Sequence, residues 1–340
     1  MNAPAAPASR KLGSQSLDLG PDAMLGLFRK MLRLRLIEEE IATRYPVEEQ
    51  KMRCPVHLSV GQEAIAIGMS AVLNPEDQVV SNHRCHAHYL AKGGDLKAML
   101  AELYGKAAGC CGGRGGSMHL FDTEAGVLLS LPIVGSSIPI GVGAAMAFKQ
   151  QGRDQVAVIY LGDAALEEGV YHESANFAAL RALPAVFLCE NNLYSVYTPL
   201  DQRQPKRPLV EMGRAHGLTC CHVDGNDVRA VLRAANEAVD QARSGGGASF
   251  ILADTYRWRE HCGPFYDNDL GYRTEEEFEA WRKRDPIARH RRLLTEAGLL
   301  DPEGEAALVR TIEDEIAEAF AFAEAAPYPE PDTAGEGVYA

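Results

Sequence analysis

The residues from Gln155 to Asn192 follow the pattern of a strand, a helix and a second strand, and this pattern constrains the fold more than any other part of the chain. The run QVAVIYL (155–161) is short, apolar and rich in β-branched residues, as is typical of a strand buried on both faces of a parallel sheet. Apolar residues at helical spacing follow from 166 to 180, and Pro184 should close that helix. A second apolar run, AVFLCE (185–190), then predicts a parallel neighbour of the first strand.

Polar residues follow both predicted strands. Asp163 and Asn192 are 29 positions apart, and a right-handed crossover of that length places both at the carboxyl edge of the sheet, where open α/β sheets bind ligands. Their oxygen atoms suit Mg²⁺, which takes one or two protein carboxylates and completes its shell with water and phosphate oxygens. The small residues Gly162, Ala164 and Ala165 would let backbone N–H groups approach a phosphate at the start of the helix.

The same alternation continues toward the C-terminus. TCCHVDG (219–225) has the pattern of a strand, NDVRAVLRAANEAVDQA (226–242) that of a helix, and SFILADTY (249–256) that of another strand. Strands alternating with helices predict an α/β fold with a doubly wound parallel sheet.

Helices are expected to flank this sheet at both ends of the chain. Pro21 to Tyr45 carries a helical apolar stripe, and Asp301-Pro302 provides a cap and first turn for a last helix. Residues 1–20 are rich in Ala, Pro and Ser, which predicts a flexible N-terminal arm. We therefore expect one domain over 21–330 and an extended C-terminal tail over 331–340.

Charge and composition exclude several classes of protein. A formal net charge of −13 disfavours nucleic acid as a partner, because such binding needs clustered Lys and Arg. No apolar run reaches the about 20 residues that a membrane helix needs, and MNAPAAPASRKLG lacks the apolar core of a secretory signal. We therefore expect no membrane association and a cytoplasmic location. The eight cysteines contain no CxxC motif, so neither a zinc ribbon nor a redox motif is indicated.

Several histidines and an arginine gather in NHRCHAH (82–88), and these residues could by themselves bind a transition metal. We disfavour that reading, because alternating side chains of an extended strand would point to opposite faces and split the cluster. The magnesium site is already supplied by Asp163 and Asn192. His57, just before GQEAIAIGMSAVL, would be structural in most chains if it were taken alone.

These motifs resemble those of a known family. The sequence GD, followed by NN about thirty residues later within ENNLYS (190–195), resembles the thiamine diphosphate signature. The motifs HLSVGQEA (57–64), NHRCHAH (82–88), GRGGSMH (113–119) and TYRWREHCGP (255–264) resemble, in this order, those of the alpha subunits of 2-oxo-acid dehydrogenases. Pyruvate and acetoin dehydrogenase alpha subunits are the most similar, and the resemblance covers roughly residues 25 to 330.

The resemblance implies a thiamine diphosphate-binding fold, with thiamine diphosphate and Mg²⁺ as cofactors. It assigns the metal to Asp163, Asn192 and Tyr194, the cofactor to Arg84, Pro132, Val134, Gly162, Asp163, Ala164, Ala165, Asn192, Tyr194 and His261, and catalysis to His57 and His261. Arg84 would grip the terminal phosphate, for which a planar, permanently charged guanidinium is suited. Pro132 and Val134 would offer backbone groups to the aminopyrimidine ring.

Thiamine diphosphate chemistry also needs a carboxylate against the pyrimidine ring, and none is identifiable here. Glu63 is a candidate, but the resembling family supplies this glutamate from a separate beta subunit. We therefore expect an α2β2 heterotetramer that decarboxylates a 2-oxo acid or cleaves acetoin and passes the acyl group to a lipoyl carrier, with a lipoyl acyltransferase as a further partner.

Two alternatives remain open at this point. Glu260 and Cys262 flank His261, where the resembling family has Gly and Ser. Because of this difference, a second function remains open: a carboligase that passes the acyl group to an aldehyde or ketosugar. The other alternative is a noncatalytic, magnesium-binding α/β module, slightly favoured by Ala164 in place of the usual Gly.

Overall fold

A computed structural model describes residues 19–46 and 49–336. The strands are β1 (Gln78–Ser81), β2 (Val127–Ser130), β3 (Ala157–Gly162), β4 (Ala185–Asn191), β5 (Tyr194–Ser195), β6 (Thr198–Pro199), β7 (Thr219–Asp224) and β8 (Ser249–Asp254). The helices are α1 (Pro21–Arg44), α2 (Glu63–Ser70), α3 (His86–Lys92), α4 (Leu96–Leu103), α5 (Ser137–Gln150), α6 (Gly169–Leu180), α7 (Leu200–Arg203), α8 (Val210–Arg214), α9 (Val228–Arg243), α10 (Glu275–Arg282), α11 (Pro286–Glu296) and α12 (Pro302–Ala325). Three short 3₁₀ helices are η1 (Asp163–Glu167), η2 (Asn268–Leu270) and η3 (Pro331–Gly335).

Six of the strands form one sheet in the order β2-β1-β3-β4-β8-β7, and every neighbouring pair in it is parallel. The predicted α/β class is therefore confirmed. β3 and β4 are adjacent, with Gly162 opposite Glu190, so Asp163 and Asn192 leave neighbouring strands at the same edge. The connecting helix α6 ends at Leu180 rather than at Pro184, because Ala182 takes a left-handed backbone conformation with φ +46°.

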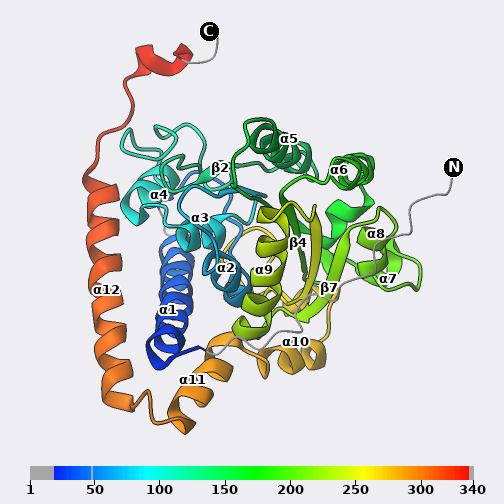
Figure 1. The fold of residues 1–340 in the computed structure, drawn as a ribbon. Coiled ribbons are helices and arrows are strands. Elements are labelled where there is room, and N and C mark those ends of the chain that lie inside the picture. The colour runs from blue at the N-terminus through cyan, green and yellow to red at the C-terminus, as the bar shows by residue number, and fades with distance from the viewer. Residues whose placement is uncertain (1–18, 47–48, 337–340) are drawn as a thin grey trace, which may run out of the picture.

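Both faces of the sheet are covered by helices (Figure 1). Along β3, Val158 and Tyr160 belong to one hydrophobic core, whereas Ala157, Ile159 and Leu161 belong to another. The first core contains side chains of α1, α2, α3, α4, α9 and α12, and the second contains those of α5, α6 and α8. Alternating residues of β3 pack on opposite helical layers, which is why this strand is apolar along its whole length.

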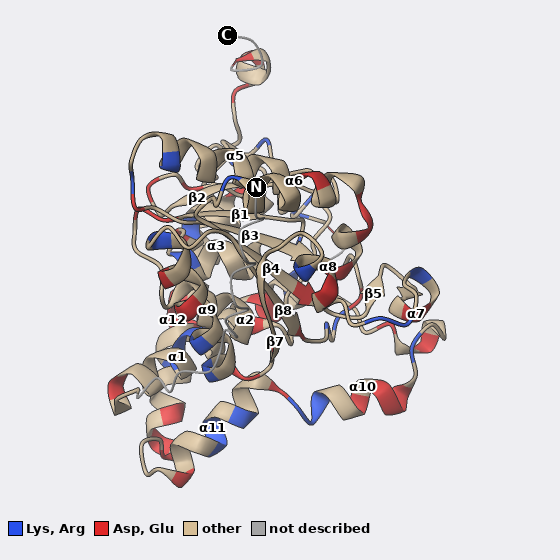
Figure 2. Ribbon diagram, turned by 45° about the vertical axis from the view of Figure 1, so that its right-hand side comes forward, with Lys and Arg blue, Asp and Glu red and all other residues tan. Residues whose placement is uncertain are grey.

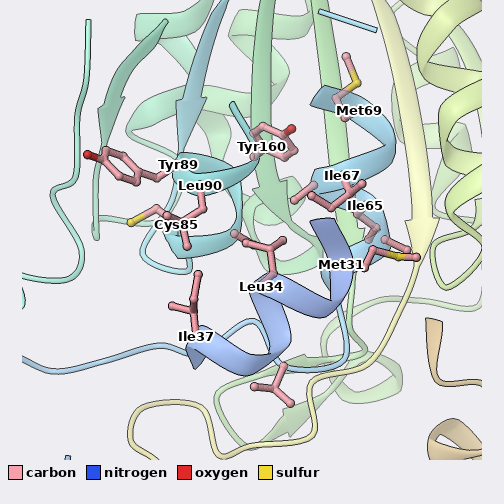
Figure 3. Close-up of a cluster of buried hydrophobic side chains, with 14 of the residues drawn as sticks. Met31, Leu34, Ile37, Ile65, Ile67, Met69, Cys85, Tyr89, Leu90 and Tyr160 are labelled. Carbon is pink, nitrogen blue, oxygen red and sulfur yellow. The ribbon is translucent and has the colours of Figure 1, made fainter. Parts of the chain in front are cut away.

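Part of the first core is drawn in Figure 3, where α1, α2 and α3 meet the sheet. Met31 and Leu34 of α1 lie beside α2, which carries Ile67, and Tyr160 of β3 lies above them. All four side chains are almost completely buried. This packing fixes the loops that precede α2 and α3, which carry His57 and Arg84.

The helices at the two ends of the described chain lie side by side (Figure 1), where Arg33 of α1 forms an ion pair with Glu315 of α12. Both predicted flanking helices are thus present. Beyond α12 the chain leaves the body of the molecule and forms the single turn η3. Within the predicted C-terminal tail, residues 331–335 form this 3₁₀ turn, and Arg114 donates to the carbonyl oxygens of Thr333 and Glu336. Most of the predicted arm, 1–18, lies outside the described residues.

Charged residues lie mainly on the outer helices and loops, whereas the strands of the sheet carry few (Figure 2). Within the described ranges, no helix combines the length and the apolar character that crossing a bilayer requires.

Candidate functional site

A pocket of about 170 Å³ opens at the carboxyl edge of β3 and β4. Loops that follow β1, β2 and β8 complete its walls. Every site residue predicted from the sequence lines this one pocket: His57, Arg84, Pro132, Val134, Gly162, Asp163, Ala164, Ala165, Asn192, Tyr194 and His261. Residues separated by up to 204 positions in the chain, from His57 to His261, are brought together by the sheet topology.

Asp163 and Asn192 present the oxygen atoms expected of a magnesium site. Asp163 is 1% exposed, and burial raises the pKa of its carboxyl, while the guanidinium of Arg203 opposes this rise. The amide oxygen of Asn192 accepts only a long hydrogen bond of 3.4 Å, from the N–H of Tyr194. The Tyr194 hydroxyl donates to Glu277 at 2.7 Å, so a metal ligand from Tyr194 would have to be its backbone carbonyl.

The backbone after β3 differs from the sequence prediction. Residues 163–167 form the 3₁₀ helix η1, and the α-helix begins only at Gly169. The prediction of a helix dipole at Ala164 and Ala165 is therefore wrong, because η1 is a single short turn. The first N–H groups of such a turn still lack partners within it, and Gly162, Ala164 and Ala165 line the pocket.

Arg84 brings a buried positive charge to the pocket. Its guanidinium donates to the carbonyl oxygens of Leu58 at 2.7 Å and His261 at 3.3 Å. Burial lowers the pKa of Arg84 to about 10, so the group stays charged at neutral pH. Its acidic neighbours Glu38 and Glu190 are each paired with a histidine. A buried cation without a carboxylate partner favours an anionic ligand.

Three histidines form the wall of the pocket beside Arg84. The ring of His57 lies 4.8 Å from that of His83 and 5.0 Å from that of His261, between ring centroids. Burial, followed by the charge of Arg84, lowers the pKa of His57 to about 2 and the pKa values of His83 and His261 to about 3. All three imidazoles are therefore neutral at pH 7.

The side chains of the histidine-rich segment 82–88 do point in different directions, but for a different reason from the one predicted. The segment is not an extended strand, because α3 begins at His86 and turns the following side chains into the core. His86 forms a 2.6 Å contact with the carboxylate of Glu38, and His88 stacks on Tyr160 with a centroid distance of 3.7 Å. Of the histidines in this segment, only His83 lines the pocket.

The opposite wall comes from the turn between β2 and α5. Pro132 and Val134 both line the pocket there. Within the described residues, neither the Pro132 carbonyl nor the Val134 N–H takes part in a hydrogen bond. These two groups can therefore accept from and donate to the polar edge of a heterocyclic ring.

Asp163 is the only carboxylate among the described residues that line the pocket. Glu63, considered from the sequence as a second one, is buried and bonded to Arg35 through both oxygens, at 2.5 and 2.9 Å. It also accepts the N–H of Gly61 at 3.0 Å. These hydrogen bonds connect α2 to α1, and the carboxylate does not face the pocket.

Comparison with known proteins identifies the family. The model of the dehydrogenase E1 component family matches residues 29–332. The chain belongs to the dehydrogenase E1 component family. This E1 component chain is 35% identical over 322 residues to the alpha subunit of acetoin:2,6-dichlorophenolindophenol oxidoreductase of Bacillus subtilis (strain 168), covering 94% of each chain. It is also similar to two alpha subunits of the pyruvate dehydrogenase E1 component.

The pyruvate dehydrogenase relative from Rhizobium meliloti (strain 1021) is 35% identical over 307 residues, with 90% of this chain and 87% of the relative covered. The relative from Zymomonas mobilis subsp. mobilis (strain ATCC 31821 / ZM4 / CP4) is 37% identical over 313 residues, with 91% and 86% covered. The family resemblance inferred from the motifs is therefore confirmed.

Two residues in or next to the E1 component pocket were not predicted from the sequence. His83 was named in its motif but not selected, although its position next to Arg84 was a signal that could have found it. Arg203 is the last residue of α7, and its guanidinium bonds the carboxylates of Asp163, which lines the pocket, and of Glu167. No pattern in the sequence links Arg203 to a residue 40 positions away.

Proposed function

We propose that this chain is the alpha subunit of a thiamine diphosphate- and Mg²⁺-dependent dehydrogenase acting on a 2-oxo acid such as pyruvate, or on acetoin. It would decarboxylate or cleave the substrate and transfer the acyl group to a lipoyl carrier. The observation that carries the proposal is the single pocket in which an oxygen pair, an unpaired buried arginine and neutral histidines meet. The names of the curated relatives support the same substrates.

The residues present fit the cofactor and its metal. Mg²⁺ would be held by the carboxylate of Asp163, the amide oxygen of Asn192 and the carbonyl of Tyr194, leaving positions for phosphate oxygens and water. Arg84 would receive the diphosphate, as would the N–H groups at the start of η1. Thiamine diphosphate supplies, when bound, the carbon nucleophile and electron sink needed to break a bond beside a carbonyl.

His57 and His261 would act on the substrate. A neutral imidazole can accept a proton, and once protonated it can donate to a developing negative charge. Burial, and after it the charge of Arg84, lowers the pKa values of both histidines and makes them weak bases in the free chain. A bound anion that neutralises Arg84 would remove the second of these two causes. We therefore assign proton transfer to these two side chains.

Substitution of the two histidines tests this assignment. His261→Ala should leave thiamine diphosphate affinity within roughly tenfold but lower acyl transfer by about 10²–10⁴-fold, the contribution of a positioned acid or base. His57→Ala should instead slow the steps at the substrate carbon. Single-turnover decarboxylation and acyl transfer, measured in the assembled enzyme alongside the melting temperature, separate these effects. A purely structural role would lower the melting temperature and leave the activity per folded molecule unchanged.

Arg203 should compete with the metal for Asp163. Its guanidinium bonds Asp163, Glu167 and the carbonyl of Thr198, so it holds the predicted metal ligand in place as a fixed positive charge. Mg²⁺ would have to displace this contact, at least from one carboxylate oxygen. Arg203 therefore opposes metal binding in the free chain.

Arg203→Gln is accordingly expected to lower the Mg²⁺ concentration needed for thiamine diphosphate binding by roughly tenfold, because a hydrogen bond to a charged group contributes about 1.5–3 kcal/mol and about 1.4 kcal/mol is tenfold. Calorimetric titration at several Mg²⁺ concentrations measures the effect. Arg207→Gln is the matched control, since Arg207 is exposed and, among the described residues, its side chain hydrogen-bonds only Gln204. If Arg203 competes with Mg²⁺ for Asp163, the Arg203→Gln variant will bind thiamine diphosphate at a lower Mg²⁺ concentration than the wild type. If the variant instead loses affinity for the cofactor, Arg203 is a phosphate ligand.

The chain is proposed to act with a beta subunit in an α2β2 heterotetramer, in the cytoplasm. Apolar side chains are exposed beside the pocket, at Ile133 (71%), Tyr197 (49%) and Phe265 (58%), each within four positions of a residue that lines it. Exposed apolar groups around a site that lacks a second carboxylate are typical of a surface that another subunit covers. A lipoyl acyltransferase is the proposed acyl acceptor.

A further inference from the structure

Three loops bring one imidazole each to a common point in the pocket. His57 precedes α2, His83 precedes α3 and His261 follows β8. One potential ligand nitrogen from each ring lies within 4.8 Å of the other two. The separation between the His83 and His261 ring centroids is 5.4 Å, so the trio is nearly equilateral.

Among the residues that the structure describes, the ring nitrogens of these histidines have no hydrogen-bond partners. The Nδ1 atom of His57 is buried without a hydrogen bond, in a residue that is 6% exposed. Hydrogen bonds between described residues likewise leave the ring nitrogens of His83 and His261 unused. Buried polar atoms are normally hydrogen-bonded, so a buried nitrogen that faces two other free imidazoles indicates a place for a ligand.

We propose that His57, His83 and His261 form a binding site for a divalent transition-metal cation of the zinc type. Three histidines with one position left open are the ligand set of an accessible zinc site, and imidazole is a preferred ligand for this class of metal. Mg²⁺ prefers oxygen, so this site is chemically distinct from Asp163 and Asn192 in the same pocket. Zinc–nitrogen distances of about 2.0–2.1 Å require the rings to close in, and the partial exposure of His83 and His261 leaves them room to turn.

Arg84 limits how tightly this site can bind. Its guanidinium donates to the His261 carbonyl, so its positive charge lies close to the proposed site and repels a bound metal cation. Binding should therefore be weaker than in a closed site made of cysteine thiolates, and it should be reversible by a chelator. A metal held by His57 and His261 would withdraw both from proton transfer, so zinc should inhibit the assembled enzyme; this consequence alone rests on the proposed function.

A second group of metal-ligating side chains, Glu102, Cys110 and Cys111, is a weaker candidate. The two oxygens of Glu102 accept four backbone N–H groups from the loop of residues 111–116. Cys111 already donates to the carbonyl of His119. These hydrogen bonds show that the Glu102 carboxylate stabilises the glycine-rich loop. Its oxygen atoms therefore have no free lone pair directed at a metal.

Cobalt(II) tests the site because it replaces zinc and absorbs visible light when its coordination is tetrahedral. The full chain, free of thiamine diphosphate, is titrated with Co²⁺ and then with Zn²⁺ or Mg²⁺. We expect one Co²⁺ per chain, displacement by Zn²⁺ but not by Mg²⁺, and no sulfur-to-cobalt charge-transfer band. His83→Ala should weaken Co²⁺ binding by at least the about 10–100-fold that loss of a metal's supporting group costs.

The melting temperatures of His83→Gln and the wild type are compared in the absence of metal. An unchanged melting temperature shows that weaker Co²⁺ binding reflects loss of a ligand and not loss of the fold. Two controls keep the trio intact. His216→Ala removes one partner of the His172–His216 pair, whose ring nitrogens are 2.9 Å apart, and Cys110→Ser removes the thiol of the other group. Both controls should bind Co²⁺ as the wild type does.

The site is refuted if folded His83 variants bind Co²⁺ as tightly as the wild type, or if binding is lost in a control instead. Absence of a tetrahedral spectrum in the wild type would refute it as well. If the spectrum changes as expected but Zn²⁺ leaves turnover untouched, the metal site stands and the proposed proton-transfer roles of His57 and His261 fail.

Discussion

Replacing Asp163 by alanine is expected to abolish the Mg²⁺-dependent binding of thiamine diphosphate, with a loss greater than the about 10–100-fold that follows removal of a metal's outer-shell partner. Asp163 is the only carboxylate of the described chain that lines the pocket, and it follows directly on β3 beside the end of β4. Without it, the proposed metal would keep only neutral oxygen ligands from this chain, and only Arg84 and the N–H groups at the start of η1 would be left to bind the diphosphate.

The fold should survive this substitution. Arg203 would lose one of its partners but keep the carboxylate of Glu167 and the carbonyl of Thr198. Calorimetry with thiamine diphosphate and Mg²⁺ measures the loss, and Asp201→Ala is a suitable control, because Asp201 is an exposed carboxylate on α7 close to Arg203 in sequence. Unchanged affinity in a folded Asp163→Ala variant would refute the assignment of the metal site.

The second large effect concerns the chain by itself, which should show no turnover of any 2-oxo acid until its beta subunit is added. The chemistry needs a carboxylate against the pyrimidine ring of the cofactor. Glu63, the candidate from the sequence, is held by Arg35 and Gly61 away from the pocket. Among the described residues, no other carboxylate besides Asp163 reaches the cavity, so a second chain has to supply this group.

Release of carbon dioxide from pyruvate, or of acetaldehyde from acetoin, measures this dependence. The isolated chain and the reconstituted complex are assayed at equal concentrations of chain, cofactor and Mg²⁺. Activity should appear only on addition of the partner and should saturate at one partner per chain. Robust turnover by the isolated polypeptide would contradict the two-subunit proposal.

The parts of the fold and site that the sequence predicted depend on local patterns. The apolar runs of β3 and β4 and the helix between them fix a parallel pair, and that pair alone places Asp163 beside Asn192. The choice of His57, Arg84 and His261 came from resemblance to a family, because nothing in local pattern distinguishes a site histidine from a structural one.

The remaining features depend on contacts that no local pattern encodes. An extended segment before α3, as the sequence pattern suggests, gives no reason to select His83. Helix initiation at His86 instead turns His86 and His88 into the core and leaves His83 beside Arg84 in the pocket. Arg203 reaches Asp163 through the turn made by β5 and β6, a tertiary contact between two polar segments that look like ordinary loops in the sequence. The commitment of Glu63 to Arg35 is likewise visible only once α1 packs on α2.

The most direct test of the account is reduction of 2,6-dichlorophenolindophenol by the reconstituted complex, with pyruvate and with acetoin as substrates and with thiamine diphosphate and Mg²⁺ present or withheld. We predict dye reduction with at least one of the two substrates, lost when either subunit, the cofactor or the metal is omitted. Reduction that persists without thiamine diphosphate, or a complex that binds the cofactor but only joins the substrate to an aldehyde or ketosugar, would contradict the assignment as a dehydrogenase.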